Sequence, residues 1–181
     1  MGKFDHGSKR ASDSDQRAFL KLVGCIKEGE QVEIRRLECE IVAGQRRADR
    51  LFKLRPLSGG GWRIEYIEDI IERAMLISLV PAHRKLPIRA WIIIMRETDM
   101  PKKWPPDFVR VRGRLKDTLE PEYVFIWRTP ARRLFELGMP LVTLVPLSLH
   151  TEADMTEASD LLRTFGDEDL MSRFLTYARM V

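Results

Sequence analysis

Two short segments, residues 47–54 and 62–67, constrain the fold of this chain more than any other feature. In each segment apolar side chains alternate with charged ones, which is the period-two pattern of a β-strand. The apolar members are Ala48, Phe52, Leu54, Trp62, Ile64 and Tyr66. Residues 56–61 between the segments include three consecutive glycines, whose freedom to adopt positive φ favours a turn with a bulge. The sequence therefore predicts an antiparallel β-hairpin.

The charged side chains of this hairpin are predicted to share its other face. They are Asp49, Lys53, Arg63 and Glu65. Two carboxylates on paired strands can hold a divalent metal, and the alternative is that this face simply meets water. A symmetrical turn places Asp49 opposite residue 68 instead of Glu65. A metal site therefore requires a bulge or a diagonal contact between the two acids.

The rest of the chain predicts one α/β domain with a mixed central sheet flanked by helices. Before the hairpin we expect a helix at residues 15–25 and one or two strands at 32–42; after it, a helix at 68–80 and a strand at 88–95 that is buried on both faces. Strands at 108–114 and 123–128 are expected to extend the sheet. Helices follow at 131–137, 152–165 and 170–180, with Gly166 as a helix stop.

Composition limits the class of protein. The chain has 181 residues, enough for one ordinary core. Its longest uninterrupted apolar run, residues 90–95, is far shorter than the roughly 18 residues that a membrane span needs. No membrane association is expected, and the lack of an apolar leader predicts a cytoplasmic protein. Three histidines and two widely spaced cysteines give little support for a zinc site.

Charge is divided unevenly along the chain. Residues 1–133 carry a net charge of +9, and residues 134–181 a net charge of −5. The richest basic stretch runs over residues 102–133, and basic surfaces attract nucleic acid through counterion release. DNA is therefore an expected partner. The alternative is that these side chains are the solvent-facing positions of ordinary edge strands.

Several short motifs, in this order, resemble a known family. They are Phe4-Asp5 with Lys9, Arg46-Arg47-Ala48-Asp49, Ile64-Glu65-Tyr66, and Leu86-Pro87-Ile88 leading into an apolar strand. Together with the order of elements they resemble the PD-(D/E)XK nuclease core. More narrowly, residues 4–150 resemble the Rpn family of recombination-promoting nucleases and transposase-related proteins.

This resemblance implies a restriction-endonuclease-like fold and a metal-dependent DNA endonuclease. The nuclease-like domain would span residues 1–150, and an acidic helical extension, residues 151–181, would pack on it. Asp49 and Glu65 would be the catalytic residues and the ligands of Mg²⁺ or Mn²⁺, with the metal activating water for attack on a phosphodiester. Because nucleases that break both strands often dimerise, a homodimer is also considered.

One position departs from the family pattern. Two residues after Glu65, where the nuclease core has Lys and the Rpn family usually has Gln, this chain has Ile67. Isoleucine can neither orient water nor stabilise developing charge. Lys53 or Arg63 could substitute for it, or Arg63 could pair with Glu65 and neutralise the site without metal. Two functions therefore stay open: an active endonuclease, and an inactive nuclease-fold module that binds nucleic acid or a protein.

Overall fold

A computed structural model describes residues 16–37, 40–41, 46–47, 50–68, 87–100, 109–112, 115–118 and 122–181. Asp49, the first of the two candidate acids, lies outside these residues. So do the N-terminal motif at residues 4–9 and the helix expected over 68–80, apart from Glu68, which ends a strand. The expectations at those positions stay predictions.

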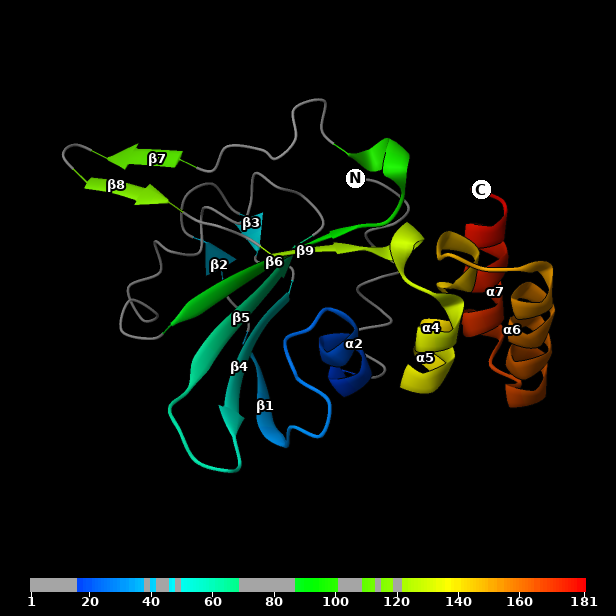
Figure 1. The fold of residues 1–181 in the computed structure, drawn as a ribbon, viewed down its shortest axis with the longest axis horizontal. Coiled ribbons are helices and arrows are strands. Elements are labelled where there is room, and N and C mark those ends of the chain that lie inside the picture. The colour runs from blue at the N-terminus through cyan, green and yellow to red at the C-terminus, as the bar shows by residue number, and fades with distance from the viewer. Residues whose placement is uncertain are drawn as a thin grey trace. The chain divides into compact units, whose positions relative to one another are not determined.

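Five strands form the main sheet. They are β1 (Val32–Leu37), β4 (Arg50–Pro56), β5 (Arg63–Glu68), β6 (Ile88–Ile94) and β9 (Glu122–Phe125). They lie in the order β1-β4-β5-β6-β9 (Figure 1). β4 is antiparallel to β1 and to β5, whereas β5 is parallel to β6. The predicted hairpin is confirmed, and the chain has the mixed sheet and the α/β class that its sequence predicts.

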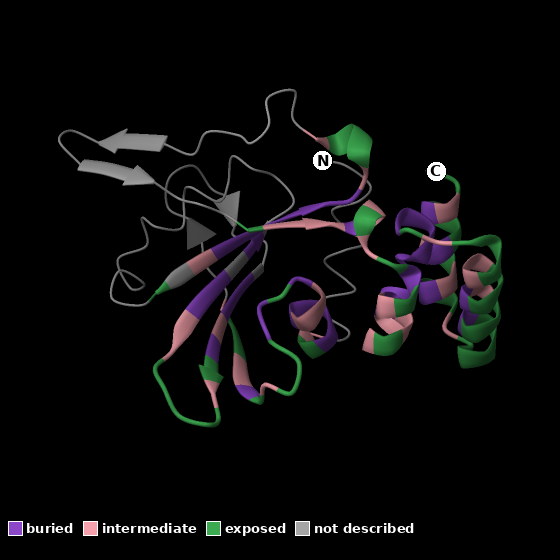
Figure 2. Ribbon diagram, in the orientation of Figure 1, coloured by how far each residue is buried: buried purple, intermediate pink, exposed green. Residues whose placement is uncertain are grey.

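The sequence patterns explain why these strands form where they do. Gly59 and Gly60 in the turn after β4 have φ values of 109° and 123°, which residues other than glycine rarely adopt. This turn is exposed, whereas the described strand residues are mostly buried or intermediate (Figure 2). In β6, residues 90–94 are all buried, although neighbouring strand residues point to opposite faces. Both faces are covered there, as the lack of alternation predicted.

Two further strand predictions need correction. The strand predicted at residues 108–114 does not extend the main sheet in its described part, because β7 (Val109–Arg112) pairs with β8 (Leu115–Thr118) in a separate two-stranded sheet. Pairing with the next segment closes a very short loop, which costs less conformational entropy than joining a distant strand. The strand expected at 123–128 is β9, but residues Ile126–Arg128 form a 3₁₀ turn, η4. β2 (Glu40–Ile41) and β3 (Arg46–Arg47) form a second small sheet.

The C-terminal helices match the predicted positions closely. α4 (Ala131–Leu137) and α6 (Glu152–Phe165) have the predicted bounds, and α7 (Glu168–Ala178) begins two residues early. α6 ends at Gly166, which adopts the left-handed conformation with φ 74°. The early start of α7 follows from Asp167, whose side chain accepts hydrogen bonds from the backbone N–H groups of residues 169 and 170.

The apolar segment between α4 and α6 has no regular sequence pattern, but it is a packed part of the core. It forms α5 (Met139–Val142) and the 3₁₀ turn η5 (Val145–Leu147), and residues 141–148 are all buried. η5 packs against α6 and α7, and α5 packs against α4 and α6. Pro146 within it prevents a longer helix.

The chain divides into two compact units. The first contains the described parts of residues 1–25, with α2 (Gln16–Leu22), residues 94–99, with the 3₁₀ turn η3 (Glu97–Asp99), and residues 125–181. The second contains the described parts of residues 26–93 and 100–124, and therefore most of the main sheet. The expected division into domains 1–150 and 151–181 stays a prediction. The second unit holds Glu65 and its surroundings.

Candidate functional site

The register between β4 and β5 decides which side chains share a face. Phe52 lies opposite Glu65, and Lys53 lies opposite Ile64, as the symmetrical turn predicted. Directly opposed residues of an antiparallel pair point to the same face. The expectation that Lys53 lies on the face of Glu65 is therefore wrong. Arg63, two residues before Glu65 on β5, does share that face.

Glu65 is neither solvent-facing nor on a polar surface. Its side chain is 0% exposed, and Phe52 and Leu54 on the same face are buried as well. On the other face, Leu51 and Ile64 are also buried. The water-facing interpretation of the hairpin is therefore wrong for Glu65, because a sheet covered on both sides can place a charged residue in its interior.

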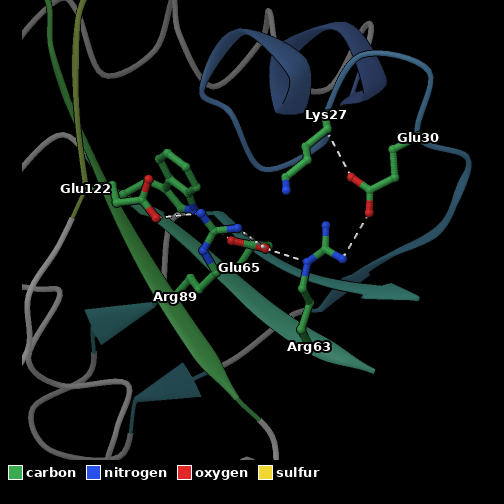
Figure 3. A network of polar contacts seen from close by, with 7 residues as sticks. Lys27, Glu30, Arg63, Glu65, Arg89 and Glu122 are labelled. Atoms are coloured by element: carbon green, nitrogen blue, oxygen red, sulfur yellow. Dashed lines mark hydrogen bonds and ion pairs between the residues drawn. The ribbon is translucent and has the colours of Figure 1, made fainter. Parts of the chain in front are cut away.

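The buried carboxylate is held by two hydrogen bonds and a nearby cation (Figure 3). The Nε atom of Arg63 donates to Oε1 of Glu65 at 2.8 Å. The indole Nε1 of Trp91 donates to Oε2 at 2.6 Å. Nη1 of Arg89 lies 3.7 Å from Oε1. A carboxylate this deeply buried needs such partners, because an unpaired charge is very costly to remove from water.

The parallel pairing of β5 with β6 brings these partners together. Glu65 is in register with Arg89, and Trp91 follows two residues later on the same face of β6. The guanidinium of Arg89 also lies 4.7 Å from the centre of the Trp91 ring and forms an ion pair with Glu122 on β9. Three neighbouring strands therefore contribute to the surroundings of one carboxylate.

Arg63 is shared between two carboxylates. Its Nη1 atom donates to Oε1 of Glu30 at 3.2 Å, and Oε2 of Glu30 accepts the backbone N–H of Lys27 at 2.9 Å. Burial alone would raise the pKa of Glu30, but the hydrogen bonds from Lys27 and Arg63 outweigh it and hold that pKa below its ordinary value. Burial would lower the pKa of Arg63, and its two glutamate partners raise it instead. Arg63 is therefore a permanent cation in this network.

The described residues of the site do not fit a metal as they stand. Both oxygens of Glu65 already accept N–H donors, so a cation would have to displace Arg63 or Trp91. Within the described part of the chain, no group of three or more His, Cys, Asp or Glu side chains could hold a metal ion. Asp49 lies outside that part. Ile67, at the departing position, is 0% exposed. Metal binding by Asp49 and Glu65 stays a prediction.

Sequence reasoning named Glu65 and Arg63 but missed the other partners. Trp91 was counted only as part of an apolar strand, and Arg89, Glu30 and Glu122 were not singled out. A signal existed in Arg89, because it is the charged residue of an otherwise apolar strand, and a half-exposed charge beside a buried sheet favours a nearby counter-charge. The identity of that counter-charge depends on the β5–β6 register, which the sequence does not reveal.

The basic stretch over residues 102–133 is only partly described. The guanidinium of Arg128 lies 5.1 Å from the centre of the Phe125 ring and 5.5 Å from that of Trp127. Phe125 and Trp127 pack edge to face at 4.9 Å. Arg132 pairs with Glu157 at 3.0 Å. These side chains therefore already have contacts within the chain, and their role toward DNA stays a prediction.

No helix in the described ranges is long and apolar enough to cross a membrane. Comparison of the chain with protein-family models, with curated proteins and with solved structures found no match. The features of the chain that bear on its function are therefore the sheet, the surroundings of Glu65 and the family resemblance of its short motifs.

Proposed function

We propose that this chain is a nucleic-acid-binding module built on a restriction-endonuclease-like sheet, in which an internal arginine takes the place of an active-site cation. The observation that carries the proposal is the contact of Arg63 with Glu65. The Arg63 guanidinium supplies, at 2.8 Å, the positive charge that a metal ion would supply in an active nuclease.

The order of the elements supports the nuclease-like part of this proposal. Helix α2 precedes β1, β4 and β5, which pair antiparallel, and β6 returns parallel to β5. A helix expected over residues 68–80 would supply the connection that parallel strands need. The Rpn resemblance rests on short motifs, of which Ile64-Glu65-Tyr66 lies on β5.

The chemistry of Glu65 supports binding over catalysis. A metal-dependent nuclease needs carboxylate oxygens that are free to coordinate the ion. In this chain those oxygens are engaged by Arg63 and Trp91, and Ile67 offers no donor to an attacking water. Breaking a buried ion pair by removing one partner costs about 3–5 kcal/mol, so replacing Arg63 by a metal is unfavourable unless the metal compensates for that loss.

The second candidate is a metal-dependent DNA endonuclease with Asp49 and Glu65 as catalytic residues and ligands of Mg²⁺ or Mn²⁺. One observation favours it. Arg63 contacts Glu30 as well as Glu65, so it could release Glu65 and still keep a carboxylate partner. The residues that would hold the ion are then Asp49 and Glu65. A cytoplasmic location and a homodimer belong to the same set of proposals.

The test combines DNA binding with plasmid cleavage. Purified protein is mixed with supercoiled plasmid and with Mg²⁺ or Mn²⁺, and binding to a labelled duplex is measured in parallel. Asp49→Ala and Glu65→Gln serve as matched variants, because a contaminating nuclease ignores both changes. We expect salt-dependent binding without nicking.

Three outcomes separate the candidates. Nicking that both variants abolish would replace the proposal with the endonuclease. A third variant, Ile67→Gln, restores the residue usual in the Rpn family. If this variant nicks plasmid and the wild-type protein does not, the chain is a nuclease inactivated by Ile67, and Arg63 is able to release Glu65. A wild-type protein that binds no DNA at any salt concentration would contradict both candidates.

A further inference from the structure

A cluster of cations surrounds Trp62, which follows the glycine turn and immediately precedes β5. The guanidinium carbon of Arg35, Nζ of Lys53 and the guanidinium carbon of Arg55 lie 4.8, 4.9 and 4.9 Å from the centre of the indole ring. Glu33 forms ion pairs with Arg35 and with Arg55. We call these five residues the Trp62 cluster.

The strand register explains how this cluster forms. Arg35 on β1 lies opposite Lys53 on β4, and Glu33 lies opposite Arg55. Positions two residues apart on a strand share a face, so all four charged side chains lie on one side of the β1–β4 pair. Lys53 lies opposite Ile64, whereas Glu65 lies opposite Phe52. The Trp62 cluster is therefore on the sheet face opposite Glu65.

The charges in the cluster do not cancel. Three cations face one ring, and among the described residues Glu33 is the carboxylate that pairs with them, which leaves a net charge of +2. Hydrogen bonds from Arg35 and Arg55 hold the pKa of Glu33 below its ordinary value, so this carboxylate is ionised at neutral pH. The side chains of Arg35 and Arg55 are 61% and 46% exposed. The excess positive charge therefore faces solvent.

Contact with the ring alone does not account for three cations. Each cation–π contact at an exposed site stabilises only weakly, about as much as two like charges a few ångströms apart repel each other in water. The indole therefore gathers and positions the cations with little net gain. Two arginines and a lysine held in this way carry the charge that complements the phosphate groups of a polyanion, and arginine binds phosphate in a bidentate manner.

We propose that the Trp62 cluster binds the phosphodiester backbone of nucleic acid, with Arg35, Lys53 and Arg55 as phosphate contacts and Trp62 as the residue that positions them. This inference rests on the proposed function, and it assigns the binding surface to the sheet face away from Glu65. Because cations lie against the indole, the contact is with phosphates and not with stacked bases. Recognition at this surface is therefore independent of sequence.

The test is a salt titration of binding, measured by fluorescence anisotropy with a labelled DNA duplex and with an RNA duplex of the same sequence. In the triple variant Arg35→Gln, Lys53→Gln, Arg55→Gln, the slope of log K against log salt should become less steep by about 2 to 3 for DNA, close to one per lost phosphate contact. Affinity at low salt should fall at least about tenfold.

The matched control removes the same charge from the other unit. Arg17, Arg163 and Arg179 are exposed arginines of the first unit, and their triple change to Gln should leave the slope near the wild-type value. If the salt dependence of the Arg35, Lys53 and Arg55 triple variant becomes less steep with both the DNA and the RNA duplex, the result supports recognition of the phosphodiester backbone that both share. Loss with DNA alone supports recognition that depends on the geometry of the DNA duplex. If the triple variant of the Trp62 cluster has the same slope as the control variant with both duplexes, the inference is overturned.

Two further measurements guard against misfolding of the triple variant. Lys53→Gln alone should reduce the slope by about 1. In the wild-type protein, bound duplex should slow acetylation of Lys53 by an amine-reactive reagent more than acetylation of Lys21, as read by mass spectrometry. Equal rates at the two lysines would count against the inference. Wild-type protein that binds no nucleic acid refutes the proposed function itself, whereas binding that ignores the cluster refutes only this assignment.

Discussion

The indole of Trp91 on β6 donates a 2.6 Å hydrogen bond to the buried carboxylate of Glu65 on β5, its parallel neighbour. Trp91→Phe keeps an aromatic ring but removes this donor. Because a buried acceptor without its partner costs about 1–3 kcal/mol, we expect a loss of stability in that range. Urea unfolding followed by circular dichroism measures it, with Trp127→Phe as the control. Equal stability of the two variants would mean that the indole N–H contributes nothing to holding Glu65.

Arg63 neutralises Glu65 in the interior of the sheet. We expect Arg63→Met to destabilise the protein by about 3–5 kcal/mol, because it leaves a buried carboxylate with fewer donors. The double variant Arg63→Met, Glu65→Leu should be less destabilised than Arg63→Met, since a buried ion pair can be exchanged for apolar groups at little cost. Arg163→Met, on the exposed side of α6, should change the free energy of unfolding by less than about 0.5 kcal/mol. A double variant less stable than the single one would contradict this account.

Glu30 gives the network a defined dependence on pH. Its pKa in the folded protein lies below the ordinary value of 4.5, because hydrogen bonds from Lys27 and Arg63 outweigh its burial. The stability that it contributes is present above the pKa of the unfolded state and is lost as pH falls through the lower, folded value. In Glu30→Gln this loss is absent. Unfolding free energies of both proteins, measured from neutral pH to below 4.5, should therefore converge at acid pH. Curves that stay parallel would rule out this linkage.

The start of α6 depends on a reciprocal pair of hydrogen bonds. The Thr151 side chain accepts from the Asp154 backbone N–H at 3.2 Å, and the Asp154 carboxylate accepts from the Thr151 N–H at 2.8 Å. Thr151→Ala removes half of this capping box and should cost about 0.5–2 kcal/mol. Thr164→Ala, which removes an exposed hydroxyl that donates to the Asp160 carbonyl of the same helix, is the control. Chemical denaturation compares the two, and similar losses would show that the cap is unimportant.

Local sequence patterns predicted much of this fold. The features that they did not predict depend on which strands pair with one another. Gly166, with its positive φ, and the capping residue Thr151 act within one turn of helix, so the bounds of α6 follow from neighbouring residues alone. The β4–β5 hairpin could be predicted for the same reason. The destination of β7 could not, because alternation identifies a strand without naming its partner.

The candidate site shows the same division. Glu65 was found from its motif, but its burial was missed, because alternation on one strand says nothing about what covers the polar face. The same alternation predicted that Lys53 and Glu65 share a face, but the β4–β5 register shows that Lys53 lies on the opposite face. The pairing of Arg63 with Glu65 was one of two alternatives, and the 2.8 Å hydrogen bond between them decides in its favour.

The contacts of Arg63 have a consequence for motion. From the Lys27 backbone through Glu30, Arg63 and Glu65 to Trp91, each polar contact joins the next, so the loop before β1 is connected to β6 through charged groups. These contacts are expected to break together, because breaking one of them leaves the neighbouring charged side chain without its partner. Amide protons of the loop and of the two parallel strands should then exchange with deuterium at a common rate, as one cooperative unit of the sheet.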